Sequence, residues 1–378
     1  MTLIIITSII VSIILGINLF IWLHPTFGAK KKFINQEKLE LSPNFKNGKF
    51  QNIESTTMMT SEGSRADVMK KFFTGVDNGK PSEKLQTVKF NKDEFASKDS
   101  GINYSWLGHS TVLININGQI IITDPVFTKA ASPVPFFNKS FDFENEYSVD
   151  ILPEIDVVLI SHDHYDHLDY KTIKKIDSKT KKFVVPLGVE AHLLRWGISA
   201  EKIEIADWGN SIRVNSDLLL TSTPARHFSG RGTRDRDKTL WCSWVIESKN
   251  EKVFFGGDSG YGNHFKDIGE KYGPFDLTLI ECGQYNENWS QIHAMPEQTI
   301  QAHIDLKGKT LLPIHWSKFR LSVHTWTEPI ERATKASIDK KVSVQNPIIG
   351  EIISLNKDVI ENYDSDIQIF TTAVPQIK

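Results

Sequence analysis

Cysteine is scarce in this chain, because the 378 residues include only Cys242 and Cys282. Two cysteines form at most one disulfide, which excludes a small secreted fold built on disulfides, and we expect reduced thiols. An excess of one charge is also missing: 44 lysines and arginines face 46 aspartates and glutamates, for a formal net charge of −2. We therefore expect no nucleic-acid partner. Hydrophobic residues make up 40% of the chain, which is enough for a sizeable core and excludes wholly disordered and collagen-like classes.

The N-terminus carries a long run without charge, LIIITSIIVSIILGINLFIWL over residues 3–23. A helix of this length spans the hydrocarbon core of a bilayer, which is about 30 Å thick. A cleaved signal peptide would need basic residues before the run and small residues at the cut, whereas no Lys or Arg precedes the run and Phe27-Gly28-Ala29 is a poor cleavage site. Lys30, Lys31 and Lys32 follow the run, and the positive-inside rule keeps them in the cytoplasm. The sequence thus predicts a single-pass membrane protein with a cytoplasmic catalytic domain. A wholly extracellular domain is the alternative.

Composition divides the chain into three parts. Residues 1–28 are expected to be a transmembrane anchor. Residues 29–101 are polar, with only a short helix-like stretch at 65–73, and are expected to be a tether that wraps the next domain. Residues 102–378 are expected to form one domain, in which strand patterns alternate with helix patterns.

The domain begins with a hairpin signal, because Asn117-Gly118 separates the β-rich runs Thr111–Ile116 and Gln119–Thr123. Later apolar runs predict further strands at Ile155–Ile160, Phe183–Val185, Leu218–Thr223, Leu240–Ile246, Val253–Phe255, Leu277–Ile280 and Thr310–Ile314. Helix patterns lie between or after them, at Val189–Trp196, His264–Tyr272, Pro296–Leu306 and Thr327–Ile338. Antiparallel strands first and mixed strands and helices later predict an α/β fold of two face-to-face sheets with helices outside.

Metal-ligand types cluster directly after one predicted strand. The segment SHDHYDHLD begins at Ser161 and contains His162, His164, Asp166 and His167. Residues two apart in an extended turn point the same way, so His162 and His164 can share one metal ion, while Asp166 and His167 face a second. Four side chains do not complete two ions, so more ligands are expected after later strands.

Three further residues follow later apolar runs, namely His227, Asp258 and His315. Singly, each is typical of an ordinary loop or turn. Together with the cluster they predict a site for two ions, in which His162, His164 and His227 bind the first, Asp166, His167 and His315 bind the second, and Asp258 bridges both. Two divalent cations, two aspartates and a bridging hydroxide leave a net charge of about +1, which suits a phosphate group. Imidazole and carboxylate without thiolate favour zinc, with iron or manganese as alternatives.

The order of these motifs resembles the metallo-β-lactamase fold superfamily, and more specifically N-acylphosphatidylethanolamine-hydrolysing phospholipase D and its bacterial relatives. Besides SHDHYDHLD, the resemblance rests on WLGHST from Trp106, TDPVF from Thr123, PARHF from Pro224, LWCSW from Leu240, GDSGY from Gly257 and IHW from Ile314. It implies an αββα sandwich, preceded here by one transmembrane helix. It also implies two Zn²⁺ ions and phosphodiester hydrolysis by a metal-bridging hydroxide.

His293 matches the position of a histidine that lies close to the substrate phosphate in that family, so the predicted catalytic residues are His293 and the bridging Asp258. His293 could donate to the developing oxyanion or protonate the leaving oxygen; a residue that only precedes the helix at Pro296 is the alternative. Asp124, at a strand end, is expected to orient the histidine turn. The basic residues of loop 226–238 fit either phosphate binding or pairing within the loop.

The leading functional hypothesis is a membrane-anchored phosphodiesterase of phospholipase D type, whose partners are a membrane and a phospholipid or other phosphodiester. A lactonase or other carboxylic-ester hydrolase is the alternative within hydrolases, because the same hydroxide can attack a carbonyl. A membrane metal-binding or scaffold protein without turnover is the alternative of another class. The oligomeric state stays open, with a homodimer as one option.

Overall fold

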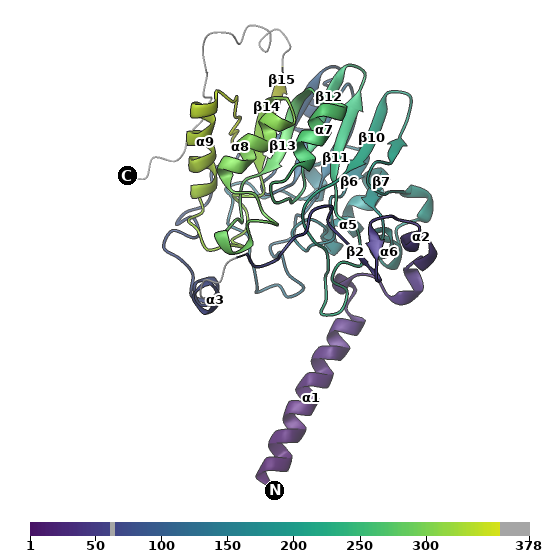
Figure 1. Cartoon of the computed structure of the whole chain (residues 1–378), viewed down its shortest axis with the longest axis vertical. Helices are drawn as coiled ribbons and strands as arrows, with labels where there is room; N and C mark the ends of the chain where they lie inside the picture. The colour runs from purple at the N-terminus through teal and green to yellow at the C-terminus, as the bar shows by residue number, and fades with distance from the viewer. Residues whose placement is uncertain (61–64, 356–378) are drawn as a thin grey trace.

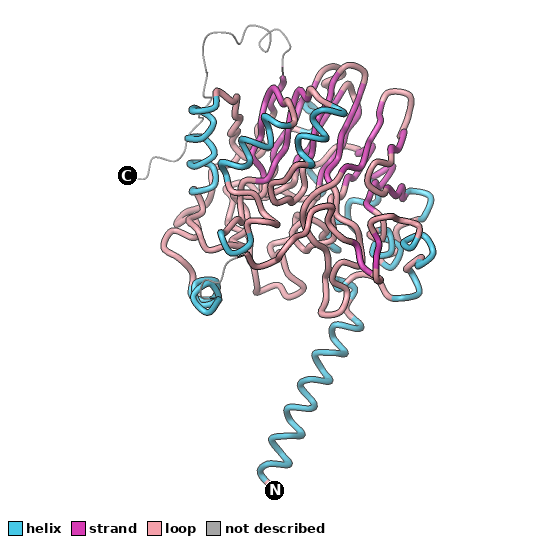
Figure 2. Tube along the Cα trace, viewed as in Figure 1, coloured by secondary structure: helices cyan, strands magenta, loops and turns pink. Residues whose placement is uncertain are grey.

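The computed structural model describes residues 1–60 and 65–355. Two β-sheets pack face to face with helices on their outer sides, and most of the loops gather at one end (Figures 1 and 2). The first sheet has the order β15-β3-β4-β5-β6-β7-β8. Its strands are β3 (Ile102–Trp106), β4 (Val112–Ile116), β5 (Gln119–Thr123), β6 (Ile155–Leu159), β7 (Thr180–Pro186), β8 (Ile203–Ala206) and β15 (Ile353–Leu355).

The second sheet has the order β14-β13-β12-β11-β10-β9. Its strands are β9 (Ser211–Arg213), β10 (Leu218–Thr223), β11 (Ser243–Ser248), β12 (Glu251–Phe255), β13 (Phe275–Glu281) and β14 (Gly308–Ile314). In both sheets antiparallel pairs come first and parallel pairs later, since β5 to β8 run parallel in one sheet and β12 to β14 in the other. Parallel neighbours place their carboxyl ends at one edge, and there loops from several strands can meet.

Three apolar layers hold the sandwich together. The central layer lies between the sheets and includes the buried residues Trp106, Ile114, Trp244 and Phe255. A second layer covers the outer face of the first sheet under α5 (Tyr170–Ile176) and α6 (Glu190–Arg195). A third covers the outer face of the second sheet under α7 (His264–Tyr272), α8 (Pro296–Asp305) and α9 (Glu328–Lys340). The predicted αββα sandwich is confirmed.

The predicted hairpin is confirmed in its register, because Ile116 pairs with Gln119 across the two-residue turn. Asn117 and Gly118 have φ values of 52° and 80°, the left-handed backbone that Asn-Gly supplies at low cost. The sequence analysis did not predict β3, β8, β9 or β15. Two of these, β9 and β15, are three-residue strands at a sheet edge, too short to show a period.

A long helix, α1 (Thr2–Leu23), extends from the loop end of the sandwich (Figure 1). Residues Ile4–Leu23 have a mean hydropathy of 2.7, and no part of this window is buried against the domain. The length and composition of α1 fit a membrane anchor, and they also fit a signal sequence.

The polar segment after α1 lies along the sandwich. It contains α2 (Gln36–Glu40), β1 (Phe45–Lys46), β2 (Lys49–Phe50), α3 (Arg65–Thr74) and α4 (Lys92–Ala96). Backbone hydrogen bonds join it to the domain at several points: Phe50 donates to Asp237, Thr60 to Asn288 and Leu85 to Asp142. The three-part division of the chain stays a prediction, and residues 61–64 and 356–378 of the second and third parts lie outside the described residues.

Candidate metal centre

The seven predicted ligands lie on loops at the same end of the two sheets. The histidine turn follows β6, whereas His227, Asp258 and His315 follow β10, β12 and β14 respectively. Although the seven positions extend over residues 162–315, the structure brings them all together in one cluster, in which five side chains are buried and His164 and Asp166 are partly exposed. Their assignment as metal ligands is a proposal that rests on this geometry.

The first group consists of His162, His164, His227 and Asp258, each with one donor atom within 4.8 Å of the others. Nδ1 of His164 lies 2.9 Å from Nε2 of His162 and 3.3 Å from Nε2 of His227. Oδ2 of Asp258 lies 3.8 Å from Nε2 of His162. Three imidazoles and one carboxylate make a four-donor set of the kind that holds zinc.

The second group consists of Asp166, His167 and His315, together with His109. Nε2 of His109 lies 2.9 Å from Oδ2 of Asp166, so His109 supports this carboxylate. Asp258 connects the two groups, because its Oδ2 lies 3.2 Å from Nε2 of His167 and its Oδ1 lies 3.1 Å from Nδ1 of His315. A carboxylate in this position is placed to bridge two ions.

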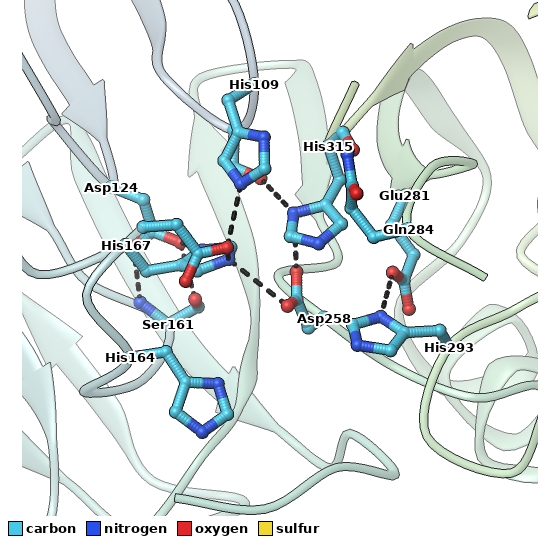
Figure 3. A network of polar contacts seen from close by, with 12 residues as sticks. His109, Asp124, Ser161, His164, His167, Asp258, Glu281, Gln284, His293 and His315 are labelled. Carbon is cyan, nitrogen blue, oxygen red and sulfur yellow. Dashed lines mark hydrogen bonds and ion pairs between the residues drawn. The ribbon is translucent and has the colours of Figure 1, made fainter. Parts of the chain in front are cut away.

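Neighbouring groups fix which nitrogen of two of these imidazoles faces the cluster. Nδ1 of His227 donates to the carbonyl of Ile292 at 2.8 Å, which leaves Nε2 as the lone-pair atom. Nδ1 of His167 donates to Asp124 at 2.6 Å, so Nε2 is the nitrogen that faces the cluster. Asp124 also accepts the backbone N–H of Ser161 at 2.8 Å, as expected for a residue that orients the turn (Figure 3).

The protonation states at the centre follow from burial and from the packed carboxylates. Burial lowers the pKa of His164 to about 4 and holds the pKa values of His162, His227 and His315 well below their usual value, so these rings are neutral. Burial also raises the pKa of Asp258 to about 7. Metal ligands must be unprotonated, and neutral imidazoles meet that requirement.

His167 is the exception among the rings. Burial alone would lower the pKa of His167, but the carboxylates of Asp258 and Asp166 raise it well above its usual value. The same contacts act on the acid: burial opposes ionisation of Asp166, yet His167 and His109 hold the pKa of Asp166 well below its usual value. Without other cations, a protonated His167 supplies the positive charge that these carboxylates need.

Two atoms at the centre indicate that a cation belongs there. Nε2 of His167 and Oδ1 of Asp258 are buried and have no hydrogen-bond partner, although Oδ2 of Asp258 lies 3.2 Å from the first and Nδ1 of His315 lies 3.1 Å from the second. Unpaired buried polar atoms are costly, at about 1–3 kcal/mol each. The donor atoms of each group therefore surround a shared position and are not fully paired with one another. The residues present fit divalent metal ions.

His293 stands at the side of this cluster. Its ring stacks on His315 at 5.4 Å between centroids and lies 5.0 Å from the ring of His227. Nδ1 of His293 lies 2.7 Å from Oε2 of Glu281, a buried residue at the end of β13 (Figure 3). Burial raises the pKa of Glu281 well above its usual range. The sequence analysis missed Glu281, although its place after an apolar strand is the same signal that found the ligands.

Two of the basic residues in loop 226–238 have structural roles. Arg226 binds the segment after β2, donating to the carbonyl of Ser55 at 3.0 Å and to Oγ1 of Thr56 at 3.0 Å. Arg231 is buried and donates to the carbonyls of Leu168 and Thr26. Arg236 remains half-exposed, with its guanidinium 5.5 Å from the ring of Phe228. Neither Arg226 nor Arg231 is free to receive a phosphate.

A junction that the sequence analysis did not predict joins α1 to the histidine turn. The ring of His192 on α6 accepts the backbone N–H of Ala29 at its Nδ1, 2.6 Å away. Its Nε2–H therefore donates to Asp163 of the turn, at 3.1 Å. Trp196 donates to the carbonyl of Pro25 at 2.8 Å, and Arg195 donates to the carbonyls of Leu23 and His24. We call residues 24–29 with α6 the junction.

A histidine and aspartate cluster at the strand ends of an αββα sandwich, with donor atoms that fit divalent cations, defines a metal-dependent hydrolase. The profile of the Beta-lactamase superfamily domain matches residues 119–316. The chain belongs to the metallo-β-lactamase superfamily.

Several known proteins are similar to this chain. An uncharacterised protein of Mycobacterium tuberculosis is 38% identical over 317 residues, which cover 82% of this chain and 84% of the relative. The N-acyl-phosphatidylethanolamine-hydrolyzing phospholipase D 1 of Caenorhabditis elegans is 32% identical over 252 residues, or 64% of this chain and 70% of the relative. The solved structure of Igni18, a metallo hydrolase of the archaeon Ignicoccus hospitalis, is similar in fold, with a TM-score of 0.51 at 23% identity over 68% of this chain and 98% of that one.

Proposed function

We propose that this protein is a membrane-anchored dinuclear zinc phosphodiesterase of phospholipase D type that hydrolyses phospholipids, N-acylated ones among them. The observation that carries the proposal is the pair of donor groups joined by Asp258, with His293 beside them. The similarity to the nematode enzyme supports the phosphodiester class of substrate.

The proposed ligands divide as the two groups do. His162, His164 and His227 would hold one ion, Asp166, His167 and His315 the other, and Asp258 both. Bound ions would act as Lewis acids on a phosphoryl oxygen and make a water molecule acidic enough to react near neutral pH. Imidazole and carboxylate donors without thiolate favour zinc in these positions.

The remaining residues position groups and move protons. Asp124 and the carbonyl of Ile292 keep His167 and His227 turned toward the cluster. His293, held by Glu281, would give a proton from Nε2 to the leaving oxygen of the alcohol part. Its other nitrogen is occupied by Glu281, so Nε2 is the atom available for this transfer.

We also propose that α1 is an uncleaved anchor, and that Lys30–Lys32 keep the catalytic domain on the cytoplasmic side. A phospholipid substrate lies in the bilayer that α1 would span. An anchored enzyme therefore meets its substrate without leaving the membrane surface.

The test is hydrolysis by the full-length chain in lipid nanodiscs. A panel of phospholipids, with N-acylphosphatidylethanolamine among them, is incubated with the zinc-loaded protein and read by mass spectrometry. Release of phosphatidic acid supports the proposal, and chelator should abolish it. The His162→Ala variant is the matched control for contaminating lipases. Hydrolysis of a lactone in place of every phosphodiester would overturn the proposal and favour the carboxylic-ester alternative, and no turnover of either would favour a non-catalytic role.

A further inference from the structure

A patch of exposed apolar side chains lies beside α3. It consists of Met69 and Phe73 on α3 and of Phe136 and Phe137 on the loop after β5, and we call it the α3 patch. Phe136 is 74% exposed and Phe73 is 65% exposed. Met69 and Phe73 are four residues apart and so lie on the same side of the helix. Large apolar side chains gathered in this way mark an interaction surface.

The α3 patch is built on the loops of the candidate metal centre. Phe72 of α3 lies 6.4 Å from the ring of Phe137, which joins the helix to the loop. Arg320 donates to the carbonyl of Phe72 at 2.9 Å, and Arg320 belongs to the loop that begins at His315. The patch therefore has a fixed support on one of the loops that carry the proposed ligands.

The α3 patch and α1 lie at the same end of the molecule. Figure 1 shows α3 at the loop end of the sandwich, from which α1 also leaves. If α1 spans a bilayer, a surface at this end faces the lipid headgroups. Lys70, Lys71 and Lys139 are exposed close to the apolar side chains in the sequence. Exposed phenylalanines bordered by lysines are typical of a surface that enters the interface of an anionic membrane.

We propose that the α3 patch is a second membrane contact, which inserts into the headgroup region of the bilayer that α1 spans. With α1 it would give the domain two separated points of attachment. The metal-centre loops would then face the lipid surface. This inference rests on the proposed anchoring by α1, but it does not depend on the lipid that is hydrolysed.

The test uses the full-length chain in vesicles of phosphatidylcholine and phosphatidylglycerol. A single cysteine is introduced by Phe136→Cys and labelled with an environment-sensitive dye, since Cys242 and Cys282 are buried. The matched control is Asn250→Cys, an exposed position in the turn before β12. Asp258 follows the other end of β12. The turn therefore lies at the opposite end of the sheet. Zinc content checks that both labelled proteins are folded.

We expect the dye at position 136 to shift its emission to the blue and to be quenched by brominated lipids, while the dye at position 250 is quenched by aqueous iodide. Iodide quenching at both positions in vesicles that carry the protein would overturn the inference. Protection at position 136 without quenching by brominated lipids would also overturn it, and would identify a contact between protein copies. Failure of the chain to float with vesicles would overturn this inference and the anchor together, whereas the lipid-hydrolysis assay tests the substrate separately.

Discussion

Replacing Glu281 by glutamine should disable His293 without emptying the metal centre. Oε1 of Glu281 accepts the backbone N–H of Ser259 at 2.6 Å and faces the N–H of Ala294 at 3.4 Å. Two N–H groups face the position of Oε1, so only an acceptor fits at that position. The amide oxygen of glutamine would therefore replace Oε1. The NH₂ group would then take the place of Oε2, which lies 2.7 Å from Nδ1 of His293.

This exchange reverses the polarity of the contact. Burial favours the neutral carboxyl of Glu281, whose proton lies between Oε2 and Nδ1 of His293. As that proton passes to Nδ1, the ring can release a proton from Nε2 as an imidazolium does. An NH₂ group disfavours a proton on Nδ1, so the ring stays neutral, and a neutral imidazole is a very weak acid. General acid–base groups contribute about 10²–10⁴-fold to turnover. At about 1.36 kcal/mol for each factor of ten, the barrier should rise by about 2.7–5.4 kcal/mol.

The assay compares kcat and KM on a chromogenic phosphodiester with zinc content by elemental analysis. We expect kcat to fall about 10²–10⁴-fold, with KM and zinc content unchanged, and His293→Ala to lose as much. Glu297→Gln is the matched control, because Glu297 pairs with Arg332 on the outer side of α8. A Glu281→Gln protein with wild-type kcat would refute the reasoning.

Three other changes test the metal centre, the fold and the junction. Asp258→Ala should lose both metal and activity, because this carboxylate approaches both donor groups; two bound equivalents of metal would contradict the assignment. His303 is buried against Thr278, and burial lowers the pKa of His303 to about 4. Below about pH 6.5 this histidine is therefore protonated in the unfolded chain but stays neutral in the folded chain. The free energy of unfolding should therefore fall by about 2 kcal/mol more in the wild type than in His303→Gln between neutral pH and about pH 5, and equal slopes in denaturant titrations would refute this. Deleting residues 1–23 should leave a soluble, metal-loaded domain, whereas deleting 1–29 also removes partners of His192, Arg231 and Trp196 and should lower Tm further; equal Tm values would mean that the junction adds no stability.

The sequence predicted those parts of the protein that a short pattern determines. The dense histidine turn implied missing ligands, and the strand ends supplied His227, Asp258 and His315, which the structure places in the same cluster. The two-sheet fold followed from the order of strands and helices. The sequence could not predict the partners of His192 or Glu281, because each is a contact between elements that local pattern does not link. Likewise, Arg226 and Arg231 look like free cations in the sequence, and only the packed loops show that backbone carbonyls occupy them.

The junction has a consequence for how an anchored enzyme would search for its substrate. Immediately after α1 ends, Pro25 is hydrogen-bonded to Trp196 and Ala29 to His192 of α6, so no flexible linker separates the bilayer from the domain. The domain would keep a set height and tilt above the bilayer. Its distance from the membrane would not vary as it does for a domain on a flexible linker. Turnover should then follow the mole fraction of substrate in the leaflet and its lateral diffusion, and dilution of the vesicles in bulk water should leave the rate per enzyme unchanged.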